Sequence, residues 1–271
     1  MIDLHCHLLP DVDDGAQTLE DSLAMAQKAV AEGISHILVT PHHQNGKYLN
    51  HKEAVLEATA ALQNEFDCRG IGITLYPSQE IRINGDLLKD IENDDILFID
   101  EEHRYLLIEF PTLSIPEYTE TLFFKLRQQG ITPVIVHPER NQAIIDDPNI
   151  LLPFIERGAL AQLTASSYVG AFGKDIAQLS SRLIEANLVH VIASDAHNVS
   201  GRGFHYKKAF SKLEAEFGSG KVQYFNQNAK DLLNGDVIHT EAPVELRTKR
   251  KSCRKLARVK RSFFSRRSAL R

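Results

Sequence analysis

Hydrophobic and polar residues along this chain follow two alternating patterns, which predict strands and helices in turn. Short apolar runs closed by turn residues are typical of buried strands, whereas apolar residues three or four positions apart are typical of helices with one buried face. Strands are predicted at residues 1–7, 35–40, 71–76, 104–110, 132–136, 160–163 and 188–193. Segments with the helical pattern separate these strands.

The first helix has the clearest boundaries. Thr18 precedes Asp21 by three residues, as in a capping box, and Gly33 ends the periodic run. Further helices are predicted at residues 51–67, 85–92, 116–129, 148–157, 174–187, 205–217 and 226–234. Alternating strands and helices indicate an α/β fold with a parallel sheet, and seven such units favour a TIM-like (β/α)7 barrel over an open sheet.

Function in such a barrel gathers at the carboxyl ends of the strands. Six of the seven predicted strands present His, Glu or Asp side chains there, and the sixth strand offers only Thr164. These candidate ligands are His5, His7, His42, Glu80, Glu109, His137, Asp195 and His197. Their number exceeds the four ligands of a single zinc ion, which favours two or three ions with Glu80 and Glu109 as bridging carboxylates. Mixed imidazole and carboxylate ligation suits Mn, Fe or Zn.

Residues beside these ligands add detail to the predicted site. Arg140 and Arg202 follow ligands closely, and the planar donor fork of arginine suits a phosphoryl group. Asp14 lies in a predicted turn, although an acid just beyond H-x-H can enter a metal shell. His43 adjoins His42 on an extended segment, so only one of the two should be a ligand.

Several other chemistries lack their sequence signatures. No cysteine has an arginine six residues later, and the P-loop, G-x-G-x-x-G and H-E-x-x-H motifs are absent. Because no side chain is a candidate nucleophile, a water molecule activated by metal is the expected attacking group.

Six short motifs occur in order along residues 1–235. They are His5-Cys6-His7, Val12-Asp13-Asp14-Gly15, Thr40-Pro41-His42, Leu107-Ile108-Glu109-Phe110-Pro111, His137-Pro138-Glu139-Arg140 and Ser194-Asp195-Ala196-His197-Asn198. In this order and spacing they resemble the PHP (polymerase and histidinol phosphatase) superfamily. Within it, the chain resembles the manganese-dependent tyrosine phosphatases of bacterial capsular and exopolysaccharide synthesis.

The resemblance implies a distorted (β/α)7 barrel with a trinuclear site, usually assigned Mn²⁺. Carried over by motif, the metal ligands would be His5, His7, Asp14, His42, Glu80, Glu109, His137, Asp195 and His197. Arg140 and Arg202 would hold the phosphate, and His42 or His197 could assist as a general acid. Glu80 is matched through a shorter string, Pro77-Ser78-Gln79-Glu80, than the other ligands.

The resemblance also implies the reaction and the partner. The reaction is hydrolysis of phosphotyrosine by a hydroxide that bridges the metal ions. The partner is the phosphotyrosine tail of a membrane-associated bacterial tyrosine kinase that regulates capsular or exopolysaccharide synthesis. Three alternatives remain open: a histidinol-phosphate-type phosphoesterase, an amidohydrolase-type barrel, and a non-catalytic adaptor that binds through its tail. Amidohydrolases commonly use a modified lysine where this chain has Glu109.

Charge divides the chain into two parts. Residues 240–271 contain 12 Lys and Arg residues and two acidic residues, whereas residues 1–239 contain 19 and 34. We therefore expect a phosphatase domain at 1–239 and a basic, disordered tail at 240–271. The acidic body argues against nucleic acid as a partner. Phe263 and Phe264 among the basic residues offer the alternative of peripheral contact with an anionic membrane.

The sequence also bears on where the protein works. No apolar run approaches the ~18 residues of a membrane span, and no secretory signal pattern opens the chain. We expect a cytoplasmic protein, located at the inner face of the membrane if the tail binds there.

Overall fold

A computed structural model describes residues 1–246 of the chain. The predicted basic tail lies outside the described residues from position 247 onward. Among the described residues, no helix combines the length and the apolar character needed to cross a bilayer.

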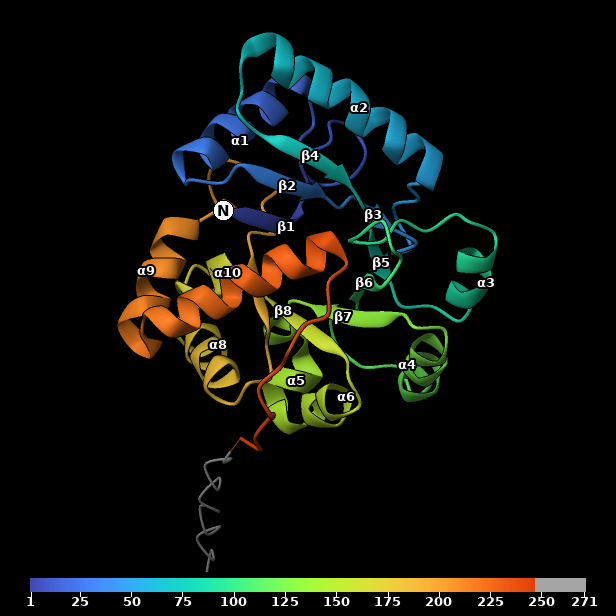
Figure 1. The fold of residues 1–271 in the computed structure, drawn as a ribbon, viewed down its shortest axis with the longest axis vertical. Coiled ribbons are helices and arrows are strands. Elements are labelled where there is room, and N and C mark those ends of the chain that lie inside the picture. The colour runs from blue at the N-terminus through green and yellow to red at the C-terminus, as the bar shows by residue number, and fades with distance from the viewer. Residues whose placement is uncertain (247–271) are drawn as a thin grey trace, which may run out of the picture.

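All strand pairs run parallel, and the strands form two sheets (Figure 1). The three-stranded sheet has the order β1-β2-β4, with β1 at Ile2–Cys6, β2 at His36–Val39 and β4 at Thr74–Pro77. The six-stranded sheet has the order β3-β5-β6-β7-β8-β9. Its strands are His42–His43, Glu80–Arg82, Tyr105–Glu109, Thr132–Val136, Leu160–Thr164 and Val191–Ala193.

Two of the seven predicted strands are each followed by a short strand that was not predicted and that belongs to the other sheet. The second predicted strand, at 35–40, becomes β2, and β3 follows after Thr40 and Pro41. The third, at 71–76, becomes β4, and β5 follows, so Glu80 begins a strand of its own. The first and last strand positions are neighbours, because Cys6 forms a parallel bridge with Ala196 beyond β9. The α/β class and the parallel arrangement are therefore confirmed, with two sheets in place of one continuous sheet.

Ten α-helices among the described residues connect and cover the strands. They are α1 Leu19–Ala31, α2 Lys52–Arg69, α3 Leu87–Glu92, α4 Thr119–Gln128, α5 Gln142–Asp146, α6 Leu152–Glu156, α7 Ala165–Tyr168, α8 Lys174–Glu185, α9 Tyr206–Phe217 and α10 Ser219–Asn234. The capping box of Thr18 and Asp21 is present. Helices α5 and α7 were not predicted, residues 148–151 form a 3₁₀ turn ahead of α6, and α10 begins seven residues before the predicted start.

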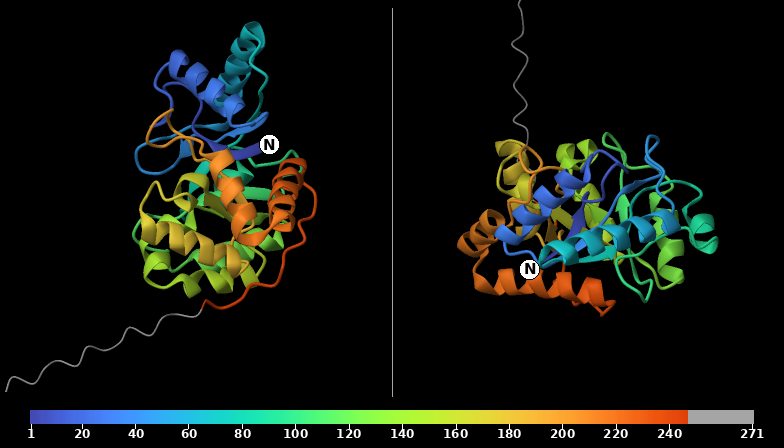
Figure 2. Two further views of the ribbon diagram at one scale, coloured as in Figure 1. Left: turned by 90° about the vertical axis from the view of Figure 1, so that its left-hand side faces the viewer. Right: turned by 90° about the horizontal axis from the view of Figure 1, so that it is seen from above.

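The apolar core has an outer and an inner part. The outer part lies between the strands and the helices around them, where α1 and α2 cover the three-stranded sheet (Figures 1 and 2). The inner part joins side chains from several strands, including Leu4, Leu38, Val134 and Val191. Helix α10 contributes Ala229 and Leu232 to the inner part. It also packs at the amino end of β9, where Asn228 donates to the carbonyl of His190.

A bulge in β1 decides which side chains face inward. Asp3 pairs with Ile37 and Cys6 pairs with Val39, so three steps along β1 match two along β2. Such an extra residue bends a strand and re-aims its side chains. Leu4 joins the inner core, Cys6 joins the outer core, and His5 lies between them in the polar cluster described next.

Candidate metal centre

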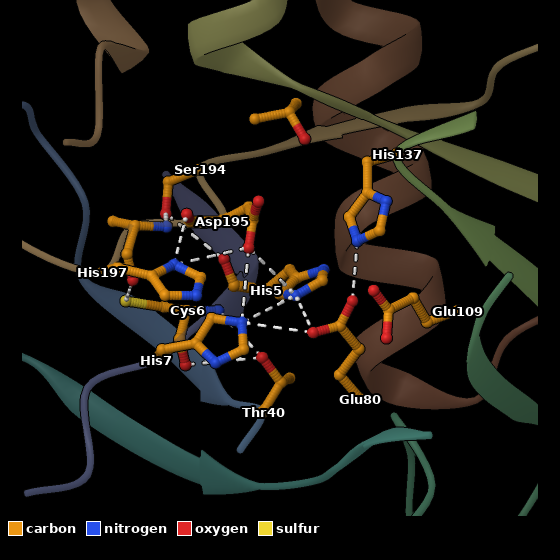
Figure 3. Close-up of polar contacts among 12 residues, drawn as sticks. His5, Cys6, His7, Thr40, Glu80, Glu109, His137, Ser194, Asp195 and His197 are labelled. Atoms are coloured by element: carbon orange, nitrogen blue, oxygen red, sulfur yellow. Dashed lines mark hydrogen bonds and ion pairs between the residues drawn. The ribbon is translucent and has the colours of Figure 1, made fainter. Parts of the chain in front are cut away.

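Eight of the nine predicted ligands form three overlapping groups, in each of which the ligand atoms lie within 4.8 Å of one another. The groups are His5, His7, Glu80 and Asp195; His42, Glu80 and Glu109; and His7, Asp14, His42 and His197. Shared members join the groups into one cluster, which lies beyond the carboxyl ends of β1, β2, β4 and β9 and includes the first residues of β3 and β5. The ninth predicted ligand, His137, points at this cluster and places Nε2 2.7 Å from Glu80 Oε1 (Figure 3).

The first group combines side chains from both sheets. His5 and His7 come from β1 and its end, Glu80 from β5, and Asp195 from the segment after β9. The Nε2 atoms of the two histidines are 3.2 Å apart, and each lies 3.3 Å from Glu80 Oε2. Asp195 Oδ1 is 3.4 Å from His5 Nε2 and 3.3 Å from His7 Nε2. The four ligand atoms thus converge on one point.

The partners of the two histidines explain why these nitrogens face each other. His7 Nδ1 lies 2.7 Å from Asp13 Oδ2, and His5 Nδ1 lies 2.9 Å from Gln162 Oε1. Because both partners can accept a hydrogen bond, each Nδ1 can donate to its partner, which leaves each Nε2 directed at the carboxylates and available to bind a metal ion. Burial disfavours charge on His7, but Asp13, Asp195 and Glu80 outweigh it and raise the pKa of His7, so this pocket favours positive charge. This donor set fits a divalent metal ion.

The second group is built around two carboxylates. Glu80 Oε2 is 2.8 Å and Glu109 Oε2 is 3.9 Å from His42 Nδ1. Burial and the charge of Glu80 raise the pKa of Glu109 to about 7, although Arg82 opposes the shift. Burial disfavours charge on His42, but Glu80 and Asp14 outweigh it and raise the pKa of His42 to about 10. Both shifts show that this pocket favours additional positive charge.

The third group lies nearest to solvent. Asp14 Oδ1 is 3.2 Å from His42 Nε2 and 3.4 Å from His197 Nε2. The rings of His197 and His7 stack with centroids 3.8 Å apart. Burial and the nearby His7 lower the pKa of His197 to about 4. Burial and Arg140 likewise lower the pKa of His137 to about 4. Both rings are therefore neutral at pH 7, which is the form that binds metals.

Several ligand atoms in the cluster are buried without a hydrogen bond among the described residues. They include Glu80 Oε2, Asp195 Oδ1 and His197 Nε2. Burying carboxylates costs several kcal/mol unless charge and hydrogen bonds compensate. The oxygen and nitrogen donors, the absence of Cys from the three groups and the shared Glu80 fit two or three divalent ions.

Backbone geometry also aims two of these side chains. Asp195 and His137 have φ angles of 50° and 35°, a region that residues other than glycine rarely occupy. Asp3 holds the segment before Asp195, because its carboxylate accepts from the Ser194 amide at 2.8 Å and from the Ser194 hydroxyl at 2.5 Å. Tyr206 donates to the same carboxylate. A local backbone cost is thus balanced by buried hydrogen bonds.

A cleft of about 290 Å³ opens over the second and third groups. His42, Glu109 and Asp14 line it together with Arg82, Arg140 and Arg202. Arg140 Nη2 lies 2.5 Å from Asp195 Oδ2, and Arg202 Nη1 donates to Asp14 Oδ2 at 3.1 Å. Both predicted phosphate-binding arginines therefore lie beside ligand carboxylates.

Sequence reasoning missed three residues around the site. Asp13 and Gln162 orient the first two histidines, and Arg82 pairs with Glu109 at 2.8 Å. The sixth predicted strand, which seemed to offer only Thr164, delivers Gln162. Two signals in the sequence pointed to two of these residues. Asp13 is a carboxylate six residues beyond His7, and Gln162 is a polar residue inside an apolar strand.

The remaining histidines lie outside the three groups. His43 is buried and binds the Asn50 carbonyl through Nδ1, so only His42 of this pair faces the cluster. His190 is buried just before β9, and its Nδ1 accepts from the amide of Ala161. His51 is exposed and pairs with Asp95 at 2.6 Å.

Comparison with known proteins agrees with this arrangement. Residues 1–234 match the family described as capsular polysaccharide synthesis, CpsB/CapC. The tyrosine-protein phosphatase YwqE of Bacillus subtilis is 45% identical over 243 residues, which cover 90% of this chain and 95% of YwqE. CapC of Staphylococcus aureus is 39% identical, over 90% of this chain and 96% of CapC.

A solved structure is also similar. It comes from a crystallographic study of YwqE and of CpsB from Streptococcus pneumoniae, described as unique metal-dependent tyrosine phosphatases. It superposes with a TM-score of 0.89 at 44% identity, over 92% of this chain and 100% of that one. The family match and these similarities cover nearly the whole described chain. The protein belongs to the CpsB/CapC family of capsular polysaccharide synthesis.

Proposed function

We propose that this chain is a metal-dependent tyrosine-protein phosphatase that acts in capsular polysaccharide synthesis. The observation that carries the proposal is the cluster of three ligand groups beneath a cleft lined by arginines. Family membership supports it, because YwqE and CpsB are named tyrosine phosphatases. The nine predicted ligands and the roles of Arg140 and Arg202 form part of the proposal.

The proposed fold is a distorted (β/α)7 barrel, with residues 1–239 as the catalytic domain. The backbone bridge between Cys6 and Ala196 supports it, since it brings the first strand beside the segment after the last. The Asp195 amide donates to the His5 carbonyl at 2.8 Å, and the His7 amide donates to the Ala196 carbonyl at 2.9 Å. The inner core beneath the cluster matches the filled interior of such barrels.

The proposed cofactor is Mn²⁺, as two or three ions, with Fe or Zn as the alternatives. Bound divalent ions would lower the pKa of a coordinated water and polarise the phosphoryl group. The eight grouped side chains and His137 would hold the ions.

The chain's own residues would bind and orient the substrate. Arg140 and Arg202 offer their guanidinium groups to the phosphoryl oxygens, where charge must be stabilised during transfer. The phenolate leaving group has a pKa of about 10, so it needs less protonation than an alkoxide. His42, which lines the cleft, and His197 are the proposed general acids, each for a state in which its ring is not engaged by metal.

The proposed substrate is the phosphotyrosine tail of a membrane-associated bacterial tyrosine kinase. The phosphatase names of the relatives support the phosphotyrosine part. The kinase, the cytoplasmic location and a peripheral membrane contact of the basic tail remain predictions, and the tail from residue 247 lies outside the described residues.

The test is phosphate release from a phosphotyrosine peptide and from histidinol phosphate, with protein stripped by a chelator and refilled with Mn²⁺, Zn²⁺ or Mg²⁺. We expect metal to restore turnover selective for the peptide. Turnover of histidinol phosphate alone would reject the tyrosine substrate, and turnover that is unaffected by stripping would reject the metal mechanism. A covalent phosphoenzyme would contradict attack by water.

A further inference from the structure

The cleft contains a third arginine, Arg82, on the same strand as Glu80. The two residues are two positions apart on β5, so their side chains leave the same face of the strand. Glu80 is fully buried in the cluster, whereas the Arg82 side chain is 22% exposed and lines the cleft. Strand β5 therefore places Glu80 in the metal cluster and Arg82 in the cleft above it.

Each arginine of the cleft pairs with at least one carboxylate of the ligand groups, and Arg202 also lies 3.5 Å from Asp195 Oδ2. Arg82 Nη2 lies 2.8 Å from Glu109 Oε2 in the second group. Arg140 pairs with Asp195 of the first group and Arg202 with Asp14 of the third. Three cationic side chains are thus held in place around one cleft, and each is fixed by a residue that also belongs to the ligand set.

The guanidinium of Arg82 uses only one of its edges in this pairing. Its Nε atom donates to Glu109 Oε2 at 2.9 Å, and its Nη2 atom lies 2.8 Å from the same oxygen in an ion pair. Its Nη1 atom has no acceptor within the described part of the chain. Because the guanidinium is planar and carries five N–H donors, a group held along one edge still presents donors along another. Glu109 and Arg82 are also register partners of adjacent strands, which makes the pair rigid.

We propose that Arg82 is a phosphate-binding residue that acts together with Arg140 and Arg202. This inference rests on the proposed phosphatase function and adds a third contact to it. A phosphotyrosine group carries a charge of about −1.5 to −2 at neutral pH and three free oxygens. Arg82 approaches these oxygens from β5, while Arg140 and Arg202 approach from the segments after β7 and β9.

A second role for Arg82 would explain the same ion pair. The guanidinium could serve only to neutralise Glu109 and hold it for a metal ion. The two roles differ in what they control, because the first sets affinity for phosphate and the second sets metal content. A measurement of both quantities on one preparation separates them.

The experiment compares Arg82→Gln, Arg82→Lys and a matched control, Arg69→Gln. Arg69 also pairs with a glutamate, Glu65, but lies on α2 with half of its side chain exposed. Each metal-loaded protein is titrated with inorganic phosphate by calorimetry, its metal content is measured, and its thermal unfolding is recorded. The KM and kcat for a phosphotyrosine peptide are measured on the same samples.

We expect Arg82→Gln to weaken phosphate binding by about 10- to 100-fold at unchanged metal content, the loss typical of one charge-assisted hydrogen bond. Arg82→Lys should recover part of this loss, because it keeps the charge but not the fork. Arg69→Gln should match the unaltered protein. Unchanged phosphate affinity in a folded, metal-loaded Arg82→Gln protein would overturn the proposal.

Loss of metal in parallel with loss of phosphate binding would also overturn it, since Arg82 would then act only through Glu109. Failure of the phosphatase function gives a different result. Inorganic phosphate would still bind in an Arg82-dependent manner, while the phosphotyrosine peptide would not be hydrolysed. If Arg82→Gln does not fold, Arg82→Lys decides: unaltered phosphate affinity and KM in that variant would reject a role for the fork.

Discussion

At the amino ends of the strands the interior is closed by apolar side chains of α10, whereas at the carboxyl ends it opens into a cleft of charged side chains. Leu232 and Ala229 pack on strand residues such as Leu4 at the closed end. Glu80 and Asp195 are buried at the open end, and some of their oxygens find no hydrogen bond within residues 1–246. Burial of apolar side chains at the amino ends stabilises the fold, whereas burial of carboxylates at the carboxyl ends costs free energy. The residues that stabilise this fold and the residues proposed for catalysis therefore lie at opposite ends of the strands.

Removing a ligand should have the largest effect of any change at the open end. Asp195→Ala deletes a carboxylate from the first group and the partner of Arg140. We expect phosphotyrosine hydrolysis to fall on the order of a thousandfold or more, since even partners of metal ligands contribute 10–100-fold. Steady-state kinetics and metal analysis measure the effect. Asp175→Ala, an exposed change on α8, is the control; near-normal turnover in Asp195→Ala would contradict the site.

At the closed end, Leu232→Ala should affect stability and leave the chemistry intact. Leu232 is fully buried in the inner core, so its truncation should lower the free energy of unfolding by about 2–5 kcal/mol. Urea denaturation measures this loss, and Lys230→Ala, an exposed change on the same helix, should cause little. The comparison fails if the folded Leu232→Ala protein also loses most of its kcat.

The contrast can be sharpened by changing a residue that touches a ligand but binds no metal. Asp13 accepts from His7 Nδ1 and from the His42 amide, so it orients two ligands. Asp13→Ala should weaken metal binding by about 10- to 100-fold, as outer partners of metal ligands typically do. Competition with a chelating dye reports the affinity, and Glu20→Ala is an exposed acidic control. Unaltered affinity would show that His7 needs no orienting partner.

The smallest expected effect concerns pH at the closed end. Burial lowers the pKa of His190 to about 4, against about 6.5 in an unfolded chain. The unfolded state therefore binds more protons between these values, so His190 makes the free energy of unfolding fall as pH drops below 6.5. Between pH 7 and pH 5 we expect His190 to lower the free energy of unfolding by about 1–2 kcal/mol. His190→Gln should remove this pH-dependent loss, whereas His239→Gln, an exposed change, should not. If the free energy of unfolding depends on pH in the same way in the unaltered and His190→Gln proteins, His190 is not the source of the pH dependence.

The sequence predicted the bounds of a helix or strand correctly where residues within that element determine them. The capping box fixed the start of α1, and the run at 132–136 became β7 with the same bounds. Strands β3 and β5 were missed, because Pro41 and the polar Ser78 and Gln79 interrupt the apolar pattern at the two places where a strand changes sheet.

The candidate site also has a part that the sequence predicts and a part that it does not. Its ligands follow strand ends, which a sequence displays, but their orienting partners depend on contacts across the fold. His5 and Gln162 are 157 positions apart, and Arg82 meets Glu109 only through the register of adjacent strands. Helix α10 began earlier than predicted, since packing of Phe225 and its neighbours on α9 and the strands extends it.

The division of the strands into two sheets has a consequence for the cooperativity of unfolding. His5 and His7 belong to the three-stranded sheet, whereas Glu80 and His42 belong to the six-stranded sheet. An ion that binds these side chains together adds a cross-link to the hydrogen bonds and apolar contacts that already join the two sheets. A chelator should then lower the melting temperature and make the transition less cooperative, with amide exchange rising first in β1, β2 and β4. The centre proposed for catalysis would also hold the halves of the protein in register.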